Sequence, residues 1–292
     1  MTGKERRWLN PRKGIVKVAE REMDLVVSRF LYPHMLRVWN PYSWLLERRF
    51  AVAEISISPA GWPKKIPRLK VLLLTDIHAG IFLKPALLSD IIGSLMELQP
   101  DLVAVAGDIV TGQPSDLDRF LPALAPLARA SLGAWFCYGN HDYYSGDPDT
   151  IRRNLSSIGI TTLKNESVVL THGNGSLVLG GIDDRILGKP DWDQLVSEHG
   201  SPHLLLAHHP DFFYEAESNG VALTLSGHTH GGQIRFPHGE PLVRQSQFYL
   251  DEGAYAYHSS LLIVSRGLGS VVLPWRFGAD PEAVLIDIIP PK

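Results

Sequence analysis

The sequence is poor in several features that would have fixed its class at once. It contains one cysteine among 292 residues, Cys137, so no internal disulfide can form and the fold does not depend on an oxidising compartment. No apolar run approaches the roughly 18 residues of a membrane-spanning helix. The basic N-terminus also lacks the continuous apolar segment of a secretory signal. These absences predict a cytoplasmic protein.

The chain also lacks an excess of positive charge. Its formal net charge is −3, from 28 Lys and Arg against 31 Asp and Glu. Residues 1–50 carry a net charge of +6, which leaves −9 for the rest of the chain. A nuclease needs a basic track along its body to hold a phosphate backbone, so no nucleic-acid partner is expected. With 45% apolar and 20% charged residues, the composition is that of a globular protein.

The positive charge lies in an N-terminal segment that is also rich in aromatic residues. We expect residues 1–60 to form a basic, aromatic-rich arm and residues 61–292 to form the main domain, because Pro59, Gly61 and Pro63 mark a turn-rich boundary. Trp, Tyr and Arg interleaved in this way suit an anionic membrane surface, so one interpretation is weak peripheral contact with the inner face of the membrane. The alternative is that these aromatic side chains dock on the main domain.

From residue 70 onward, short apolar runs alternate with helical patterns. The expected strands are 71–75, 102–106, 134–138, 167–170, 177–180, 203–207, 223–226, 261–265 and 283–288, and the expected helices are 85–98, 117–128 and 150–158. Strands that alternate with helices predict βαβ units and an α/β fold. The second half has more strands than helices, which predicts two packed sheets with helices outside.

Five of the expected strands run into residues that can bind a metal. The segments that follow them are Asp76-Ile77-His78, Gly107-Asp108, Gly139-Asn140-His141-Asp142, His208-His209 and Gly227-His228-Thr229-His230. Ligands bind at the carboxyl ends of strands in open α/β sheets, so these side chains are expected at one edge. In an extended segment, the two side chains of Asp-x-His or His-x-His point the same way. Each motif alone is common in turns, but a centre with two metal ions explains all five together.

The motifs, in this order, resemble the signature of the calcineurin-like metallophosphoesterases over about residues 68–289. Two later segments, Ser265-Arg266-Gly267-Leu268-Gly269 and Pro274-Trp275-Arg276-Phe277, resemble the YkuE/YaeI-like bacterial phosphodiesterases within that family. The resemblance implies a four-layer α/β/β/α sandwich of two mixed sheets. It also implies two divalent cations as cofactors. The donors are imidazole and oxygen without thiolate, which leaves Mn, Fe(II) or Zn.

The resemblance assigns a role to each motif residue. One ion would be held by Asp76, His78 and His230, the other by Asn140, His208 and His228, and Asp108 would bridge both. His141 would protonate the leaving oxygen, with Asp142 holding its imidazole, although His141 could instead orient a metal ligand. His209 would be a bystander, and Cys137 a small core residue. Arg266 and Arg276 are candidates for clamping a substrate phosphate, with a structural ion pair, for example to Glu282, as the alternative.

The expected reaction is metal-assisted hydrolysis of a phosphodiester, phosphomonoester or pyrophosphate bond. The apolar N-terminal arm favours a lipid-linked substrate, and the resembling subgroup includes enzymes that act on UDP-2,3-diacylglucosamine in lipid A synthesis. A protein phosphatase or a nuclease with the same centre is an alternative. A non-catalytic metal-binding scaffold is another, but the full set of ligand residues argues against it.

Overall fold

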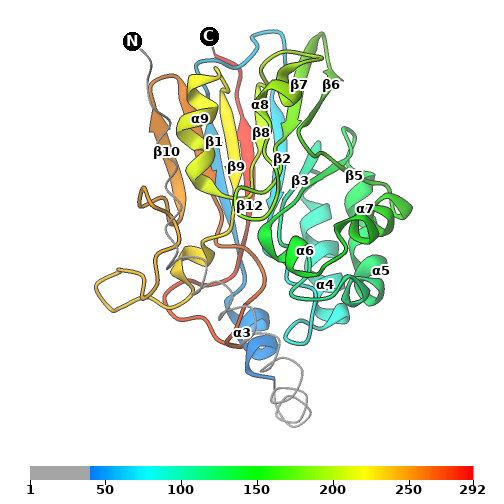
Figure 1. The fold of residues 1–292 in the computed structure, drawn as a ribbon, viewed down its shortest axis with the longest axis vertical. Helices are drawn as coiled ribbons and strands as arrows, with labels where there is room; N and C mark the ends of the chain where they lie inside the picture. The colour runs from blue at the N-terminus through cyan, green and yellow to red at the C-terminus, as the bar shows by residue number, and fades with distance from the viewer. Residues whose placement is uncertain (1–39, 292) are drawn as a thin grey trace.

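The first of two sheets carries the N-terminal strands of the domain. The structure is a computed structural model that describes residues 40–291, and its strands form two six-stranded sheets (Figure 1). The strands of the first sheet, in spatial order, are β1 (Ala51–Ile57), β12 (Glu282–Ile288), β2 (Leu69–Leu74), β3 (Leu102–Ala106), β4 (Ala134–Cys137) and β5 (Ile160–Thr162). Strands β12 and β2 pair antiparallel and the other neighbours pair parallel, so the sheet is mixed.

The second sheet is built from the later part of the chain. Its strands, in spatial order, are β10 (Gly253–Tyr257), β11 (Ser260–Val264), β9 (Leu223–Ser226), β8 (Leu204–Leu206), β7 (Gly175–Gly181) and β6 (Glu166–His172). Strands β11, β9, β8 and β7 are parallel, while both edge strands are antiparallel to their neighbours. Strands β6 and β7 form the hairpin expected around residues 173–174. Two mixed sheets are therefore present, as predicted.

The helices cover the outer faces of the two sheets. They are α3 (Pro41–Arg49), α4 (Pro85–Glu97), α5 (Leu121–Leu124), α6 (Asn140–Tyr144), α7 (Pro148–Ser157), α8 (Trp192–Val196) and α9 (Phe213–Ser218). In Figure 1, α4, α5 and α7 lie together on one side of the strands, away from α9. The side chains of α8 and α9 instead pack with β8 of the second sheet.

Strand β2 shows how the layers are held together. Its residues Leu69, Val71 and Leu73 belong to the apolar core between the two sheets, whereas Leu72 and Leu74 belong to the core beneath the helices of the first sheet. Successive side chains of a strand point to opposite faces, so a strand buried on both faces is apolar throughout. The result is the α/β/β/α sandwich implied by the resemblance.

The N-terminal boundary lies earlier than the composition indicated. Residues 41–57, which we assigned to the arm, form α3 and β1, and β1 pairs with β12 along its whole length. Tyr42, Leu45 and Leu46 are buried in the core beneath the first sheet. This part of the predicted arm therefore belongs to the domain. Residues 1–39, with Trp8, Phe30, Tyr32 and Trp39, lie outside the described residues. Within residues 40–291 no helix is long and apolar enough to cross a bilayer.

The helix expected over 117–128 is broken in the structure. Only Leu121–Leu124 is α-helical, and short 3₁₀ turns flank it at Asp118–Phe120 and Ala125–Arg129. Pro122 and Pro126 explain the break, because each lacks the backbone N–H that a continuous helix would use. The apolar spacing alone did not reveal this.

Candidate metal centre

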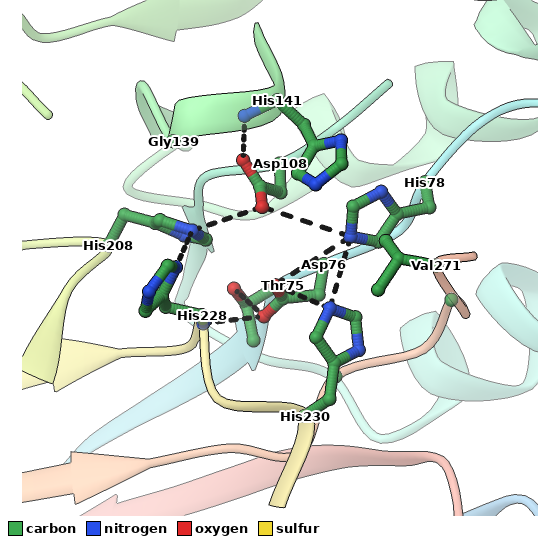
Figure 2. Close-up of polar contacts among 12 residues, drawn as sticks. Thr75, Asp76, His78, Asp108, Gly139, His141, His208, His228, His230 and Val271 are labelled. Atoms are coloured by element: carbon green, nitrogen blue, oxygen red, sulfur yellow. Dashed lines mark hydrogen bonds and ion pairs between the residues drawn. The ribbon is translucent and has the colours of Figure 1, made fainter. Parts of the chain in front are cut away.

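Seven candidate ligands from five connections meet at one edge of the paired sheets. These connections follow β2, β3, β4, β8 and β9. Figure 2 shows the side chains of Asp76, His78, Asp108, His208, His228 and His230 gathered around one point. Every one of the seven side chains is buried, and they are Asp76, His78, Asp108, Asn140, His208, His228 and His230. The sequence predicted this convergence from the residues that end the strands.

Three of these side chains form a first group. Asp76, His78 and His230 offer ligand atoms that all lie within 4.8 Å of one another. The two imidazoles face each other through their Nε2 atoms at 3.2 Å, and Asp76 Oδ1 lies 3.3 Å from His230 Nε2 (Figure 2). One carboxylate oxygen and two ring nitrogens therefore converge on a single point.

Asp108, His208 and His228 form a second group of the same size. Asp108 Oδ2 lies 3.1 Å from His208 Nε2, which in turn lies 3.3 Å from His228 Nδ1. The same carboxylate oxygen lies 3.8 Å from His78 Nε2 of the first group. Asp108 thus stands between the two groups, where one carboxylate can face two cations.

The backbone at these residues is not extended. Asp76, His78, Asp108, His228 and His230 all have φ between 49° and 71°, in the left-handed region that non-glycine residues rarely adopt. The expectation that Asp-x-His and His-x-His are extended segments is therefore wrong. Strand β2 ends at Leu74 and strand β9 at Ser226, so each strand has ended before its motif begins. His228 and His230 consequently contribute to different groups. Such backbone conformations cluster at functional sites.

Two glycines allow the chain to pass close to the carboxylates. A Cβ on Gly227 would lie 2.2 Å from Asp76 Oδ2, and a Cβ on Gly139 would lie 2.3 Å from Asp108 Oδ1. Neither position could accept a side chain without moving a candidate ligand. The glycines of the motifs are thus required by close approach to these acids.

The donor set fits divalent cations. Asp76 Oδ1 and Asn140 Oδ1 are buried oxygens without a hydrogen-bond partner among residues 40–291. Buried polar atoms are normally satisfied, so two unpaired acceptors at one edge indicate a ligand that the protein itself does not supply. Imidazole and carboxylate donors without thiolate suit first-row divalent metals.

His208 is oriented so that a metal would bind it through Nε2. Its Nδ1 lies 2.8 Å from the carbonyl oxygen of Ala106, and a carbonyl can only accept. Nδ1 therefore carries a hydrogen, and Nε2 is the ring nitrogen that faces Asp108 and His228. Metal-bound histidines usually have this kind of support from a second group.

The electrostatics of the metal-free groups reflect burial and close charges. Burial opposes the charge on His208, but Asp108 outweighs it and raises the pKa of His208 to about 10. Burial likewise opposes the negative charge on Asp108, yet the charge of His208 holds the pKa of that carboxyl well below its usual range. Burial raises the pKa of Asp76 to about 6. Two cations would change this balance, since they would be the largest charges present.

His141 and Asp142 do not act on each other, contrary to our expectation. His141 Nδ1 lies 2.8 Å from the carbonyl oxygen of Thr111, so this carbonyl orients the ring. The Asp142 carboxylate accepts three backbone N–H bonds at 2.8–2.9 Å, from Asp108, Ile109 and Gly139. Neighbours in a helical turn point in different directions, and here one side chain faces the metal groups while the other holds the Asp108 loop.

The two arginines are engaged elsewhere than expected. Arg266 makes ion pairs with Glu282 (2.5 Å) and Glu252 (3.3 Å), which is the structural alternative considered from the sequence. Arg276 is only 1% exposed and its Nη2 lies 2.9 Å from His230 Nδ1. A side chain that must clamp a substrate phosphate needs free donors at an accessible surface. Arg276 lacks that exposure, and both terminal nitrogens of Arg266 are paired with glutamates.

Two other residues stand as anticipated. Cys137 is fully buried in the core between the sheets, and burial raises the pKa of its thiol well above the ordinary value, which makes it a core residue. His209 packs its ring 4.3 Å from that of His228 and accepts the N–H of Asp211. It belongs to neither ligand group.

Asp183 and Asp184 also lie at this edge and were not predicted from the sequence. They follow β7, which ends at the same edge as the neighbouring β8, and both are 1% exposed. Asp183 accepts the hydroxyl of Tyr143 at 2.5 Å, so it braces the helix that carries His141. The signal was available, because acidic residues directly after a buried strand are the pattern used for Asp108.

The fold and this centre define the calcineurin-like phosphoesterases. The family model for calcineurin-like phosphoesterase matches residues 69–232, which include all five strands that precede the motifs and all seven candidate ligands, and the chain belongs to this family. Membership indicates a phosphoester hydrolase.

Two relatives are similar over most of the chain. The metallophosphoesterase YkuE of Bacillus subtilis (strain 168) is 30% identical over 269 residues, which cover 89% of this chain and 88% of that protein. The phosphodiesterase YaeI of Escherichia coli (strain K12) is 34% identical over 226 residues, or 75% and 82% of the two chains. Among solved structures, the NAD nucleotidase NadN of Haemophilus influenzae has a TM-score of 0.46 at 14% identity, covering 70% of this chain and 46% of that one.

Proposed function

We propose that the chain hydrolyses phosphoesters with two divalent cations held by the two groups at the sheet edge. Asp76, His78 and His230 would hold one cation. Asn140, His208 and His228 would hold the other, and Asp108 would serve both. The observation that carries the proposal is the position of Asp108 Oδ2, 3.1 Å from His208 Nε2 and 3.8 Å from His78 Nε2.

Cations in such a centre act as Lewis acids on the phosphoryl oxygens and lower the pKa of water. The protein supplies the geometry for this chemistry. Asp142 holds the backbone of the Asp108 loop through three amides, and Asp108 Oδ1 accepts the N–H of His141 at 2.7 Å. The ligand carboxylate is thereby fixed in both position and rotation.

His141 is the residue we propose as general acid. Its Nδ1–H is directed to the Thr111 carbonyl, which leaves Nε2 as the atom that can deliver a proton to the leaving oxygen. The ring packs edge-on against His78 at 4.8 Å between centroids, so it borders the first ligand group (Figure 2). It is also partly exposed, as a group that meets a substrate must be.

For the substrate, we propose a phosphodiester, since YaeI carries the name phosphodiesterase. Manganese, iron or zinc would suit the imidazole and carboxylate donors. Negative charge on the body of the chain disfavours the nuclease alternative.

A lipid-linked substrate, such as UDP-2,3-diacylglucosamine, is the more specific form of this proposal. Its support is an exposed apolar surface on two neighbouring loops, whose side chains Phe236, Leu242, Trp275 and Phe277 are 41–55% exposed. The loops are joined by the bridge between Ile234 and Phe277. One of these loops carries Arg276, which contacts the candidate ligand His230, so the apolar surface lies next to the candidate metal centre. Such a surface suits acyl chains or a membrane.

Vesicle sedimentation tests this membrane contact. The full chain should sediment with vesicles of anionic phospholipid at low salt and be released at high salt, because the basic residues 1–39 would contribute to binding. Removal of residues 1–39 should weaken the binding. Equal sedimentation of both forms would exclude a role for that segment.

The phosphoesterase proposal is tested by hydrolysis of bis-p-nitrophenyl phosphate with added Mn²⁺. Asp108→Asn and His228→Ala should each lower the rate by about 100-fold or more, since each removes a charge or donor from the centre. His258→Ala is the matched control, because His258 is exposed and pairs with Glu217 away from the centre. Retained activity in the two folded centre variants would exclude the binuclear mechanism, and bound metal without any hydrolysis across a range of phosphoesters would favour the scaffold.

A further inference from the structure

Arg276 is a buried charge whose presence needs an explanation. It lies in the loop between β11 and β12 and is the largest of the fully buried side chains in the described part of the chain. Its neighbours Trp275 and Phe277 are 41% and 54% exposed, so the loop turns its apolar side chains outward and its one guanidinium inward. Burying an arginine is costly unless its donors are used.

The guanidinium is fixed by hydrogen bonds from three directions. Nε donates to the carbonyl of Gly269 at 2.8 Å, Nη1 donates to that of Ala279 at 3.3 Å, and Nη2 lies 2.9 Å from His230 Nδ1. The buried phenol of Tyr42, on α3, is also hydrogen-bonded to Arg276 and donates to the carbonyl of Leu268. These partners hold the side chain rigidly behind a candidate metal ligand.

None of these partners neutralises the charge. Within residues 40–291, no carboxylate lies within ion-pair distance of Arg276, whereas Arg266 pairs with Glu252 and Glu282. The positive charge of Arg276 therefore acts on the first ligand group without compensation at its own position. In a buried site such a charge is only weakly screened.

The two candidate groups thus differ in what supports their histidines. His208 Nδ1 faces a carbonyl, which can only accept, so Nδ1 keeps a hydrogen and Nε2 is the nitrogen that a cation in the second group would bind in place of a proton. His230 Nδ1 faces a guanidinium, which can only donate, so in the neutral ring it is Nδ1 that presents the lone pair. His230 Nε2, the atom that faces Asp76, is then less available as a donor, and the adjacent positive charge further opposes a cation there.

We propose that the two cation positions have unequal affinity and that Arg276 is the positioning residue that sets the difference. The position at Asp108, His208 and His228 binds tightly. The position at Asp76, His78 and His230 binds weakly and exchanges its cation, because Arg276 stands behind it. This inference rests on the proposed binuclear centre and concerns its regulation by metal supply.

The first test is the titration of the metal-free full-length protein with Mn²⁺, followed by calorimetry. The wild type should bind two equivalents in steps whose dissociation constants differ at least tenfold. His208→Ala should remove the tighter step and His230→Ala the weaker one. The reverse assignment, or two equal steps, would overturn the proposal.

The second test separates the charge of Arg276 from its shape. Arg276→Met should tighten the weaker step by at least tenfold, because it removes the charge, and should leave the tighter step within about threefold. Arg276→Lys retains the charge and should keep the weaker step within about threefold of the wild type. Arg235→Met is the matched control, since Arg235 donates to the Gly231 carbonyl, next to His230, but contacts no candidate ligand.

An unchanged or weakened second step in folded Arg276→Met would contradict the proposal. Circular dichroism of the metal-free proteins establishes that each variant is folded. If Arg276→Met does not fold, the histidine variants still show whether the position beside Arg276 is the weaker one, which the proposal requires. Because binding is measured without a substrate, failure of this inference is separate from failure of the phosphoesterase proposal, which is judged by hydrolysis at saturating Mn²⁺.

Discussion

His141 can be tested at the level of one side chain, because its backbone and its ring have different tasks. The backbone N–H supports Asp108 and survives in His141→Ala, whereas the ring is lost. We expect kcat to fall by about 100- to 10,000-fold, the usual contribution of a general acid. Bound Mn²⁺, measured by plasma emission spectroscopy, should stay at the wild-type level, since the ring is in neither ligand group. A change of less than threefold in kcat would exclude the acid role.

Asp142 is expected to affect stability rather than proton transfer. In Asp142→Asn, an amide NH₂ would face backbone N–H groups that now donate to a carboxylate oxygen, leaving a buried donor unpaired. Such a group costs about 1–3 kcal/mol in the free energy of unfolding, which urea denaturation of the metal-free protein would measure.

Asp147→Asn provides the control for this measurement. Asp147 caps α7 by accepting the N–H of Thr150, and Asn is as good a helix cap as Asp. The unfolding free energy of Asp147→Asn should therefore equal that of the wild type within the error of the measurement. An equal change in the free energy of unfolding for both substitutions would show that the buried Asp142 hydrogen bonds stabilise the fold no more than an exposed helix cap does.

At the residue scale, the sequence predicted which side chains gather but not how they are supported. The Asp and His residues after each strand were visible because strand ends share one edge. The partners of His141, Asp142 and Arg276 are backbone groups or distant residues, which no spacing along the chain reveals. These partners become visible only in the folded structure, where left-handed turns and tertiary contacts bring them together.

At the scale of elements, α3 is expected to be part of the folded domain. Leu46 is 1% exposed in the core beneath the first sheet, so Leu46→Ala should lower the free energy of unfolding by about 2–5 kcal/mol. Glu47→Ala, on the exposed face of the same helix, should change it by less than about 0.5 kcal/mol. Urea denaturation measures both. A negligible effect of Leu46→Ala would show that α3 does not contribute to the stability of the folded domain.

The elements that were missed share a physical cause. Strand β1 has its side chains mostly exposed or half-buried, so it lacks the apolar run that revealed β2 and β3. Its pairing with β12 joins segments more than 200 residues apart, which local pattern cannot show. By contrast, α4 was predicted almost to the residue, because its apolar spacing and flanking prolines agree.

At the scale of the whole molecule, the metal should stabilise the fold. The two ligand groups join connections from both sheets, so cations that bind only the native state would tie the sheets together. Free Mn²⁺ at 100 times its dissociation constant should raise the free energy of unfolding by about 2.7 kcal/mol. Denaturation in excess Mn²⁺ and in a chelator measures the difference. Asp108→Asn should show a smaller gain, and equal stability of the wild type in both conditions would contradict the account.

The most direct test of the binuclear centre is the anomalous diffraction of a crystal grown with Mn²⁺. Two manganese peaks are expected at the sheet edge, one beside Asp76, His78 and His230 and the other beside His208 and His228. The Asp108 carboxylate should contact both. A single peak at saturating Mn²⁺, or peaks away from these side chains, would contradict the binuclear centre.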